Sequence, residues 1–433
     1  MLLAVKSLAY GGDGVARAED GRAVFVRGGC PGDTVKAEVV ADKGRFLKAS
    51  VSEIVDPSAQ RVKPPCAYFG ECGGCQWQHV SYAAQVAAKR QSVADALARI
   101  GHVSDYVLDD VVMGPEPYGY RNKAEFTVAR TDGSMRLGYL TAGGRDLVSI
   151  SQCLLLPASH RKAPGALAGV VRYLSNDSSS VDVSRVALRV AHRRTDVEVD
   201  LWGPPGGFPR QMAAKAFTSA VGANTVTRAL LKGRAGERKV SRVEVLSGRG
   251  AWRERLGRYD YSVSAPSFFQ VNTAAAELLV DLVLEGIQPT RKDRVLDLYA
   301  GVGTFTLPLA AEAGETVAVE GEGSAIRDLR KNLESARLRA VVVPGDATRA
   351  LEGLGRFDAA VVDPPRSGMR ASALHHLVAS CPRRIVYVSC DPATLARDAG
   401  LLRDAGYKLA RVTPVDLFPQ TYHVEAVAQF VRA

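Results

Sequence analysis

Residues 294–307 have the sequence RVLDLYAGVGTFTL: a short apolar run, two glycines at alternate positions, and the beginning of a second apolar run. This order is typical of a strand that turns sharply into a helix, because Gly301 and Gly303 allow a tight turn and a close approach of the backbone to a ligand. Thr306 stands where the dinucleotide fingerprint has its third glycine. Glu320, at the end of the next apolar run, is placed to accept hydrogen bonds from ribose hydroxyls. The loop therefore predicts a nucleoside cofactor without a pyrophosphate, such as S-adenosylmethionine. An incidental glycine pair is the alternative.

Apolar runs and helical segments alternate on both sides of this loop. A helix is expected over 273–286. Strands are expected at 294–299, 317–320, 340–346, 357–363 and 384–390. Alternation of this kind is the pattern of a doubly wound α/β domain with a mainly parallel sheet, and we assign residues 261–433 to such a Rossmann-like domain.

The first 260 residues are mainly β-like. Residues 1–57 hold short alternating runs separated by glycine-rich turns, which predicts a small, OB-like β-barrel. Further on, a linker and a cysteine cluster precede a helix over 82–100, and alternating runs from about residue 120 predict a largely antiparallel β domain. The chain of 433 residues is thus expected to form three domains, with bounds 1–57, 58–260 and 261–433.

The net charge is +10, and the excess of basic residues is concentrated in one part of the chain. Between residues 151 and 260, 19 Lys and Arg stand against 9 Asp and Glu, whereas the remaining segments are close to balance. Such a block indicates a polyanionic partner, although a solubilising surface would have the same composition. The side chains that we expect to contact phosphates are Arg185, Arg189, Arg193, Arg194, Arg234, Arg238 and Lys239.

Seven cysteines in 433 residues are too few for a disulfide scaffold, and no apolar stretch has the length of a membrane-spanning helix. The apolar run at the N-terminus is too brief for the core of a signal peptide. These features predict a cytoplasmic protein with reduced thiols, without membrane association and in a monomeric state.

Cys390 follows an expected strand and precedes a helix that starts at Asp391. Asp363, in the sequence DPPR, follows the neighbouring strand, so both residues should lie at the carboxyl edge of the sheet, where open α/β folds bind ligands. A helix N-terminus lowers the pKa of a nearby thiol, which predicts an activated nucleophile rather than a buried structural cysteine. His423 and Glu425 would share one face of a later strand, and either could accept a proton. We expect a structural role for His423.

Three cysteines lie close together in a glycine-containing loop, and a fourth lies further along the chain. The set is Cys66, Cys72, Cys75 and Cys153. In a reducing compartment such a set is expected to bind a metal or a cluster rather than to form disulfides. Four thiolates would complete either a zinc site or an iron–sulfur cluster, and the spacing does not distinguish the two. Cys30 and Cys381 have no assigned role.

Five short motifs together carry a resemblance to a known family. They are SFFQVN (267–272), DLYAGVGTFTLPLA (297–310), DPPR (363–366), SCDP (389–392) and HVE (423–425). As a set they resemble the RNA uracil-5-methyltransferases of the RumA/TrmA type, over nearly the whole chain. The resemblance implies a class I S-adenosylmethionine-dependent methyltransferase domain at the C-terminus and C5-methylation of a uridine in RNA.

The resemblance also implies roles for individual residues. Cys390 would attack C6 of the uracil, and Glu425 would remove the proton from C5, with Asp363 in the same catalytic group. Contacts to the cofactor or the target base fall on Gln270, Tyr299, Gly301, Gly303, Thr304, Glu320, Asp346 and Asp363. A thiol at a sheet edge can reach only an unstacked base, so a flipped or single-stranded uridine is implied, with Phe268 and Phe269 as a stacking surface.

A TRAM domain combined with an iron–sulfur pattern is typical of the ribosomal RNA enzymes of this family. The resemblance therefore implies that residues 1–57 are a TRAM domain and favours 23S ribosomal RNA over transfer RNA. It implies a [4Fe–4S] cluster held by Cys66, Cys72, Cys75 and Cys153. RNA contacts are implied for Lys43, Arg45, Lys48 and the segment Tyr120-Arg121-Asn122-Lys123.

Two other classes of function are compatible with the residues alone. The chain could be an RNA-binding or RNA-folding protein in which methylation is secondary. It could also be a nicotinamide-dependent oxidoreductase, since a strand, a glycine turn and a helix also bind dinucleotides.

Overall fold

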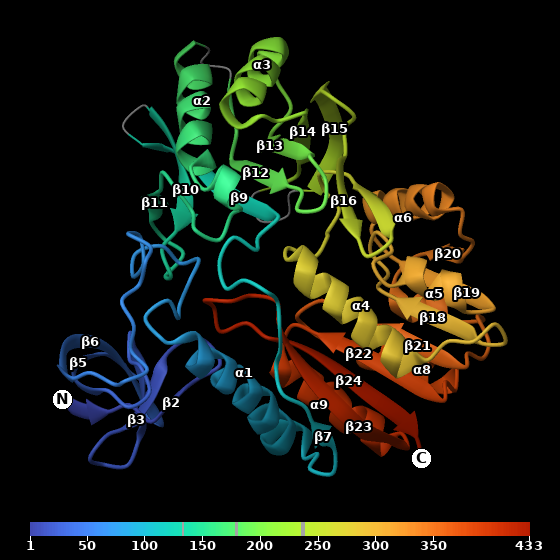
Figure 1. Cartoon of the computed structure of the whole chain (residues 1–433), viewed down its shortest axis with the longest axis horizontal. Coiled ribbons are helices and arrows are strands. Elements are labelled where there is room, and N and C mark those ends of the chain that lie inside the picture. The colour runs from blue at the N-terminus through green and yellow to red at the C-terminus, as the bar shows by residue number, and fades with distance from the viewer. Residues whose placement is uncertain (132–133, 178–180, 235–238) are drawn as a thin grey trace.

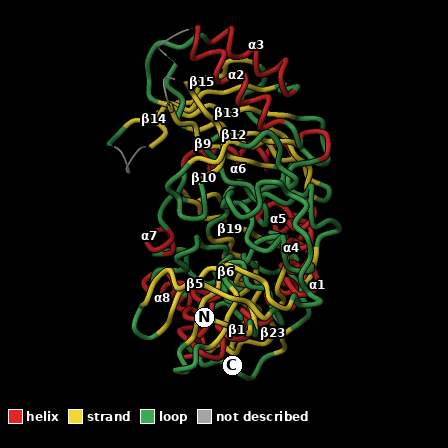
Figure 2. The backbone as a smooth tube through the Cα atoms, turned by 90° about the vertical axis from the view of Figure 1, so that its left-hand side faces the viewer, coloured by secondary structure: helices red, strands yellow, loops and turns green. Residues whose placement is uncertain are grey.

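The computed structural model describes residues 1–131, 134–177, 181–234 and 239–433. Three large β-sheets lie in separate parts of the molecule: a blue N-terminal sheet, a green central sheet and an orange-to-red C-terminal sheet (Figure 1). The side view places the central sheet at one end of the molecule and both chain termini at the other (Figure 2). No helix in the described ranges combines the length and apolar character needed to cross a membrane.

The N-terminal sheet has six strands in the order β1-β5-β6-β4-β3-β2. Its strands are β1 (Leu2–Ala4), β2 (Ser7–Leu8), β3 (Gly14–Arg17), β4 (Ala23–Arg27), β5 (Thr34–Asp42) and β6 (Phe46–Asp56). Along β4, Val24 and Val26 are buried and Arg27 is exposed, because successive side chains of a strand point to opposite faces. The buried residues form a separate small core, as the glycine-punctuated pattern predicted.

The central sheet has seven strands in the order β11-β10-β9-β12-β13-β14-β15. Its strands are β9 (Lys123–Thr131), β10 (Ser134–Leu140), β11 (Leu147–Ser149), β12 (Arg185–Val190), β13 (Val197–Gly203), β14 (Thr225–Lys232) and β15 (Lys239–Ser247). All neighbours are antiparallel except β13 and β14, which are parallel. Two helices, α2 (Ala163–Asp177) and α3 (Arg210–Val221), contribute to the apolar core of this sheet.

The C-terminal sheet confirms the predicted doubly wound fold. Its strands are β18 (Arg294–Leu298), β19 (Glu315–Glu320), β20 (Val341–Pro344), β21 (Ala359–Val362), β22 (Arg384–Ser389), β23 (Tyr407–Asp416) and β24 (Glu425–Arg432). Strands β18 to β22 are parallel, and β24 lies antiparallel between β22 and β23. Two short strands from earlier in the chain, β7 (Val107–Leu108) and β8 (Val112–Met113), pair with β23, so part of the interval 58–260 belongs to this sheet.

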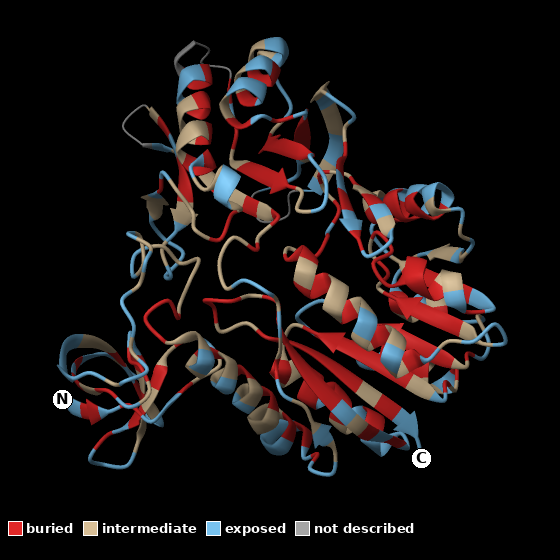
Figure 3. Cartoon of the chain, viewed as in Figure 1, coloured by how far each residue is buried: buried red, intermediate tan, exposed pale blue. Residues whose placement is uncertain are grey.

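Helices cover both faces of the C-terminal sheet and bury its strands (Figure 3). On one face lie α4 (Thr273–Ile287), α5 (Thr306–Glu312) and α6 (Gly323–Ala336). On the other face lie α1 (Tyr82–Ala96), α7 (Ala347–Leu351), α8 (Ala371–Ala379) and α9 (Pro392–Asp404). Helix α1 continues as a π-helical turn to Gly101, where the sequence predicted its end. A hairpin, β16 (Trp252–Leu256) and β17 (Tyr259–Val263), packs against α4 and α6 and joins the central sheet to this domain.

Candidate active site

The glycine loop lies at the carboxyl end of β18. Gly301 and Gly303 have φ values of 57° and 99°, which favour glycine, and a Cβ atom on Gly303 would stand 2.6 Å from Leu329 Cδ1, so that this leucine would have to move. The Gly301 N–H donates to Glu320 Oε2 at 2.7 Å. Glu320 therefore ties the end of β19 to the loop and holds its carboxylate at the edge where a ribose would bind. Tyr299, also at positive φ (68°), turns the chain out of β18.

Three further residues predicted to contact the cofactor differ in how far they are buried. Thr304 and Gln270 are buried. Asp346 caps the N-terminus of α7, where its side chain accepts from the Thr348 N–H at 3.0 Å, and it forms an exposed ion pair with Arg370. The structure thus brings strand ends of β18, β19 and β21 to one edge, as the parallel order requires.

Cys390 lies between the end of β22 and the first turn of α9. We predicted that the helix N-terminus would lower the pKa of its thiol, but other groups around it act in the opposite direction. Burial and the charges of Glu425 and Asp363 raise the pKa of Cys390 to about 12. Asp391, whose side chain caps α9 and accepts hydrogen bonds from two of its N–H groups at 2.9 and 3.0 Å, also raises this pKa through its charge.

Glu425 is the first residue of β24, which runs antiparallel to β22. The register pairs Ser389 with Ala426, so Cys390, directly after β22, lies near Glu425, the first residue of β24, whose charge acts on its thiol. Burial and the charge of Asp363 raise the pKa of Glu425 to about 8. Strand register therefore builds a thiol–carboxyl pair at the sheet edge.

Asp363 completes this group from the other side of β22. It follows β21, and burial together with the charge of Asp297 raises its pKa to about 7. Arg366, three residues later, is exposed and acts in the opposite direction, lowering the pKa of both Cys390 and Glu425. The sequence motif DPPR contained this arginine, but no role was assigned to it.

His423 is uncharged at physiological pH, because burial lowers its pKa to about 4. Its ring packs on Tyr422, with centroids 4.1 Å apart, and against Phe418. Its Nδ1 atom is buried and has no hydrogen-bond partner among the described residues. A neutral imidazole with this low pKa is a weaker candidate for the base than Glu425.

The SFFQ motif presents its two aromatic rings differently. Phe269 is buried and packs against Trp252 and Tyr261, with centroids 5.6 and 5.5 Å apart, so it belongs to the core. Phe268 is 62% exposed. Only Phe268 is available as the predicted stacking surface.

Arg189 corrects our assignment of the basic block. We expected it to contact phosphate, but its side chain is 1% exposed and pairs with Glu198 at 3.0 Å. Its guanidinium also donates to the carbonyls of Ala265 and Ser267 at 3.2 and 2.8 Å. Arg189 therefore fixes the chain that leads into SFFQ, because a buried guanidinium needs acceptors for its N–H groups.

Other members of the basic block have acidic partners. Ion pairs join Arg185 to Glu125, Arg193 to Glu277 and Arg194 to Asp260. Arg234 and Lys239 are exposed, and Arg238 lies outside the described residues. In the N-terminal sheet Lys43, Arg45 and Lys48 are all exposed.

The segment Tyr120-Arg121-Asn122-Lys123, which we expected to contact RNA, is a structural junction. The Tyr120 hydroxyl donates to the Pro419 carbonyl at 3.0 Å, and the Asn122 amide donates to the Gln270 carbonyl at 2.9 Å. Both side chains are buried. The segment thus holds two loops of the candidate active site in place and is not free to contact RNA at these positions.

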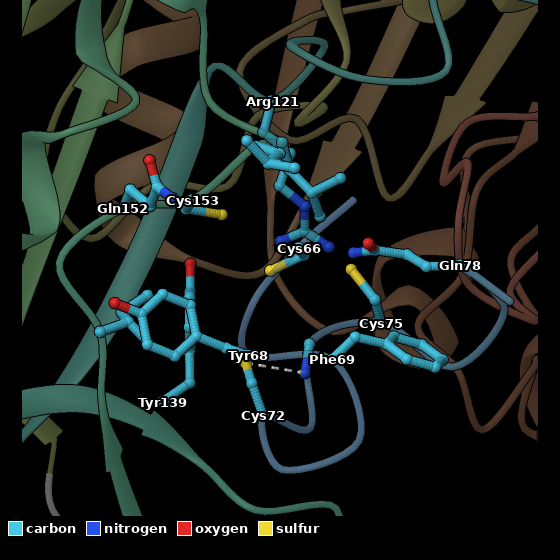
Figure 4. Close-up of a pocket in the computed structure, with 14 residues that line it drawn as sticks. Cys66, Tyr68, Phe69, Cys72, Cys75, Gln78, Arg121, Tyr139, Gln152 and Cys153 are labelled. Atoms are coloured by element: carbon cyan, nitrogen blue, oxygen red, sulfur yellow. Dashed lines mark hydrogen bonds between the residues drawn. The ribbon is translucent and has the colours of Figure 1, made fainter. Parts of the chain in front are cut away.

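Four cysteines line one cavity of about 50 Å³, which we call the cysteine pocket: Cys66, Cys72, Cys75 and Cys153 (Figure 4). All four are free thiols. The remaining walls include Ile150, Leu154, Leu155, Tyr139 and Arg121. Within the described residues, no three histidine, cysteine or carboxylate side chains form a ready-made site for a metal ion.

Three family models match the chain. They are the TRAM domain over residues 1–52, the methyltransferase small domain over 264–386 and the tRNA (uracil-5-)-methyltransferase model over 351–432. An uncharacterised RNA methyltransferase of Thermosynechococcus vestitus is 36% identical and covers 98% of this chain and 96% of its own length. One of Halalkalibacterium halodurans is 32% identical, with 98% and 95% covered.

A solved structure is similar over the whole molecule. The crystal structure of the Pyrococcus abyssi tRNA (uracil-54, C5)-methyltransferase, in complex with S-adenosyl-L-homocysteine, has a TM-score of 0.77 at 26% identity and covers 100% of both chains. The fold and the site thus define a Rossmann-like methyltransferase with an N-terminal TRAM domain. More narrowly, the chain belongs to the RNA uracil-5-methyltransferase family, as the sequence motifs predicted.

Proposed function

We propose that this protein transfers the methyl group of S-adenosylmethionine to C5 of a uridine in RNA. The observation that carries the proposal is the strand register that sets Cys390 near Glu425, next to Asp363 and at the edge that holds the glycine loop. A thiol directly after one strand and a carboxyl at the start of the neighbouring strand can act on C6 and C5, the two carbons of one uracil double bond.

The chemistry needs one nucleophile and one base. The Cys390 thiol loses its proton to solvent, the resulting thiolate bonds to C6, and the electron pair of the double bond makes C5 enolate-like. C5 then takes the methyl group from the sulfonium, which leaves as S-adenosylhomocysteine. Glu425 removes the proton from C5, the C5–C6 double bond re-forms, and Cys390 leaves as a thiolate.

The charges of the free site fit this sequence of events. With a pKa of about 8, Glu425 is ionised in only part of the molecules near neutral pH, and in these its carboxylate is basic enough to accept a proton. The thiol of Cys390 is held protonated by burial and by the nearby carboxyls, so it is protected from side reactions in the free enzyme. Arg366 and a bound sulfonium are the positive charges that would favour the thiolate.

Contacts to S-adenosylmethionine and the target base are proposed for Gln270, Tyr299, Gly301, Gly303, Thr304, Glu320, Asp346 and Asp363. Glu320 would accept hydrogen bonds from the ribose hydroxyls, and Phe268 would stack on a base. Within this scheme residues 261–433 carry out catalysis, whereas residues 1–57 and 58–260 bind the RNA. The exposed cations of the N-terminal sheet support the RNA-binding part of the proposal.

A [4Fe–4S] cluster is proposed for the cysteine pocket. The donor set fits, since four free thiols and apolar side chains surround one cavity. The cluster would act as a cross-link between the loop of Cys66–Cys75 and the segment of Cys153.

The ribosomal RNA of the large subunit is the substrate that we propose first, because a TRAM domain and a four-cysteine set occur together here. Transfer RNA is the second candidate, because the similar Pyrococcus abyssi enzyme is named for a transfer RNA uridine. Mass-spectrometric mapping of 5-methyluridine in both RNA classes from a deletion strain distinguishes them: the mark is lost from the true substrate.

The reaction itself is tested with RNA that contains 5-fluorouridine. Fluorine cannot be removed from C5, so a covalent protein–RNA adduct should accumulate in the presence of S-adenosylmethionine and map to Cys390. An adduct on another residue would overturn the assignment of the nucleophile. Retention of NADH without retention of S-adenosylmethionine in equilibrium dialysis would show an oxidoreductase instead. If Cys390→Ala restored the deletion strain as well as the wild-type protein does, the protein would act by binding RNA.

A further inference from the structure

One turn of the N-terminal sheet reaches the candidate active site. Tyr10 lies between β2 and β3, yet its hydroxyl donates to the Cys390 carbonyl at 3.2 Å and to Asp391 Oδ2 at 3.3 Å. Its ring packs edge-to-face on Tyr422, with centroids 5.3 Å apart. A single side chain of the TRAM domain therefore contacts both the nucleophile segment and the loop that leads into Glu425.

The same turn is seated tightly against the surrounding loops. Gly12 accepts a hydrogen bond from Trp77 Nε1 at 3.0 Å. A Cβ atom on Gly12 would lie 3.0 Å from Gln76 Cβ and 3.3 Å from Tyr422 Cδ1, which leaves little room for a side chain. The backbone N–H groups of Gln76 and Trp77 both donate to the Gln420 carbonyl at 3.1 Å. This seating fixes the Tyr10 hydroxyl relative to the catalytic strands.

We propose that Tyr10 is a positioning residue for the nucleophile, so that the TRAM domain takes part in catalysis as well as in RNA binding. The inference rests on the proposed function of Cys390. One hydroxyl holds the carbonyl of Cys390 and the capping carboxylate of the next residue, and thereby fixes the backbone that carries Sγ. Loss of such positioning slows the chemical step and so lowers kcat, whereas the binding of RNA is little affected.

The hydroxyl also affects the electrostatics of the thiol. The charged groups that face Cys390 are Glu425, Asp363, Arg366 and Asp391. Loss of the Tyr10 hydroxyl would leave Asp391 Oδ2 without this donor, so its negative charge would act more strongly on the thiol. Ionisation of Cys390 would then require a higher pH.

The test compares Tyr10→Phe with Tyr407→Phe. Tyr407 is the matched control, because its buried hydroxyl also donates to a backbone carbonyl, that of Pro382, at the opposite end of β22. In Tyr10→Phe we expect kcat for RNA methylation to fall about tenfold, with KM for RNA within about twofold. The rate at which iodoacetamide alkylates Cys390, measured by peptide mass spectrometry, should rise only at higher pH than in the wild type. Both quantities should stay unchanged in Tyr407→Phe.

Two outcomes would overturn the inference. A raised KM with unchanged kcat would show that Tyr10 serves RNA binding alone. An unshifted alkylation profile would show that its hydroxyl does not act on the nucleophile. The alkylation profile requires neither RNA nor methyl transfer, so it remains a test of Tyr10 even if uridine methylation is not the reaction. Far-ultraviolet circular dichroism confirms that each variant is folded, and a Tyr10→Leu variant should show the same alkylation shift.

Discussion

The thiol of Cys390 and the thiols of the cysteine pocket stand in opposite surroundings. Burial raises the pKa of Cys390 and of Cys75 to about 12 in each case. The second largest influence on the pKa differs between the two thiols. For Cys390 it is the charge of Glu425, which raises the pKa, whereas for Cys75 it is a hydrogen bond from Gln78, which lowers it. The other groups that raise the pKa of Cys75 are thiols of the same pocket. The thiol pKa alone thus does not identify a function, but its neighbours do. Carboxyls beside the thiol suit the nucleophile that we propose for Cys390, and further thiols suit the cluster that we propose for the cysteine pocket.

Replacing the nucleophile should have the largest effect. Cys390→Ala should reduce methylation by about 10⁴-fold or more, because no covalent addition to C6 remains possible. Iron content and the visible spectrum should match the wild type, since the cysteine pocket is intact. Radiolabelled methyl transfer to RNA measures the first quantity, and metal analysis measures the second. Substantial remaining transfer would mean that the two thiol sites have been assigned wrongly.

Replacing the proposed base should stall the reaction after methyl transfer. Glu425→Gln should lower turnover by about 10³-fold, because general-base catalysis contributes on this scale. Unlike Cys390→Ala, it should accumulate a covalent adduct with ordinary RNA, and the adduct should carry the transferred methyl group. Gel electrophoresis with labelled methyl donor detects it. Normal turnover without an adduct would point to a different base.

Replacing a pocket thiol should affect the proposed cluster and the stability of the fold more than methyl transfer. We expect anaerobically purified protein to be brown and Cys72→Ser to lose both colour and iron. The melting temperature should fall by roughly 10 °C, because a bound group stabilises only the folded state. The pH profile for alkylation of Cys390 should not move. Cys381→Ser, outside the pocket, is the control and should keep its iron. Stoichiometric zinc in a colourless wild type would refute the cluster.

The Rossmann-like domain was predictable because its signals are local. Residues 294–307 form β18, the glycine loop and the start of α5 in the expected order, and the helix expected at 273–286 is α4, Thr273–Ile287. Strand ends predicted the edge where Cys390 and Asp363 meet. These features depend on periodicity and on glycines within a few residues of each other.

The electrostatics of the site and the role of Arg189 were not predictable, because they depend on residues far apart in sequence. The thiol of Cys390 responds to a carboxyl on β24 and to one after β21, and a capping side chain occupies the helix N–H groups. Arg189 looked like a surface cation in an arginine-rich strand, but carbonyls beyond residue 260 surround it. Tyr10 carries no motif, and 380 residues separate it from the group that it contacts.

Protonation of the active-site carboxyls should make stability depend on pH. Glu425 has its pKa raised to about 8, and Asp363 and Asp297 to about 7, above their values in an unfolded chain. The folded state therefore binds protons that the unfolded chain releases. Its stabilisation is complete below about pH 4 and is lost as the pH rises through 7 to 8. We expect the free energy of unfolding to fall between pH 5 and 9, and to fall by less in Glu425→Gln. Urea titrations at each pH measure this, and an equal slope in both proteins would contradict it.

Arg121 lines the cysteine pocket, and Arg366 acts on the thiol of Cys390. Replacing Arg366 should change the rate of methylation less than the replacements above. Arg366 lowers the pKa of Cys390 and of Glu425, but it is exposed, so solvent screens its charge. Arg366→Gln should therefore reduce kcat at pH 7 only about three- to tenfold and move the rising limb of the pH–rate profile upward. Arg356→Gln is the control, since Arg356 is also exposed but lies before β21 rather than after it. Because 0.5 M salt screens an exposed charge, it should reduce the difference between Arg366→Gln and wild type. If the difference did not depend on salt, Arg366 would act by direct contact with the substrate rather than through the field at the thiol.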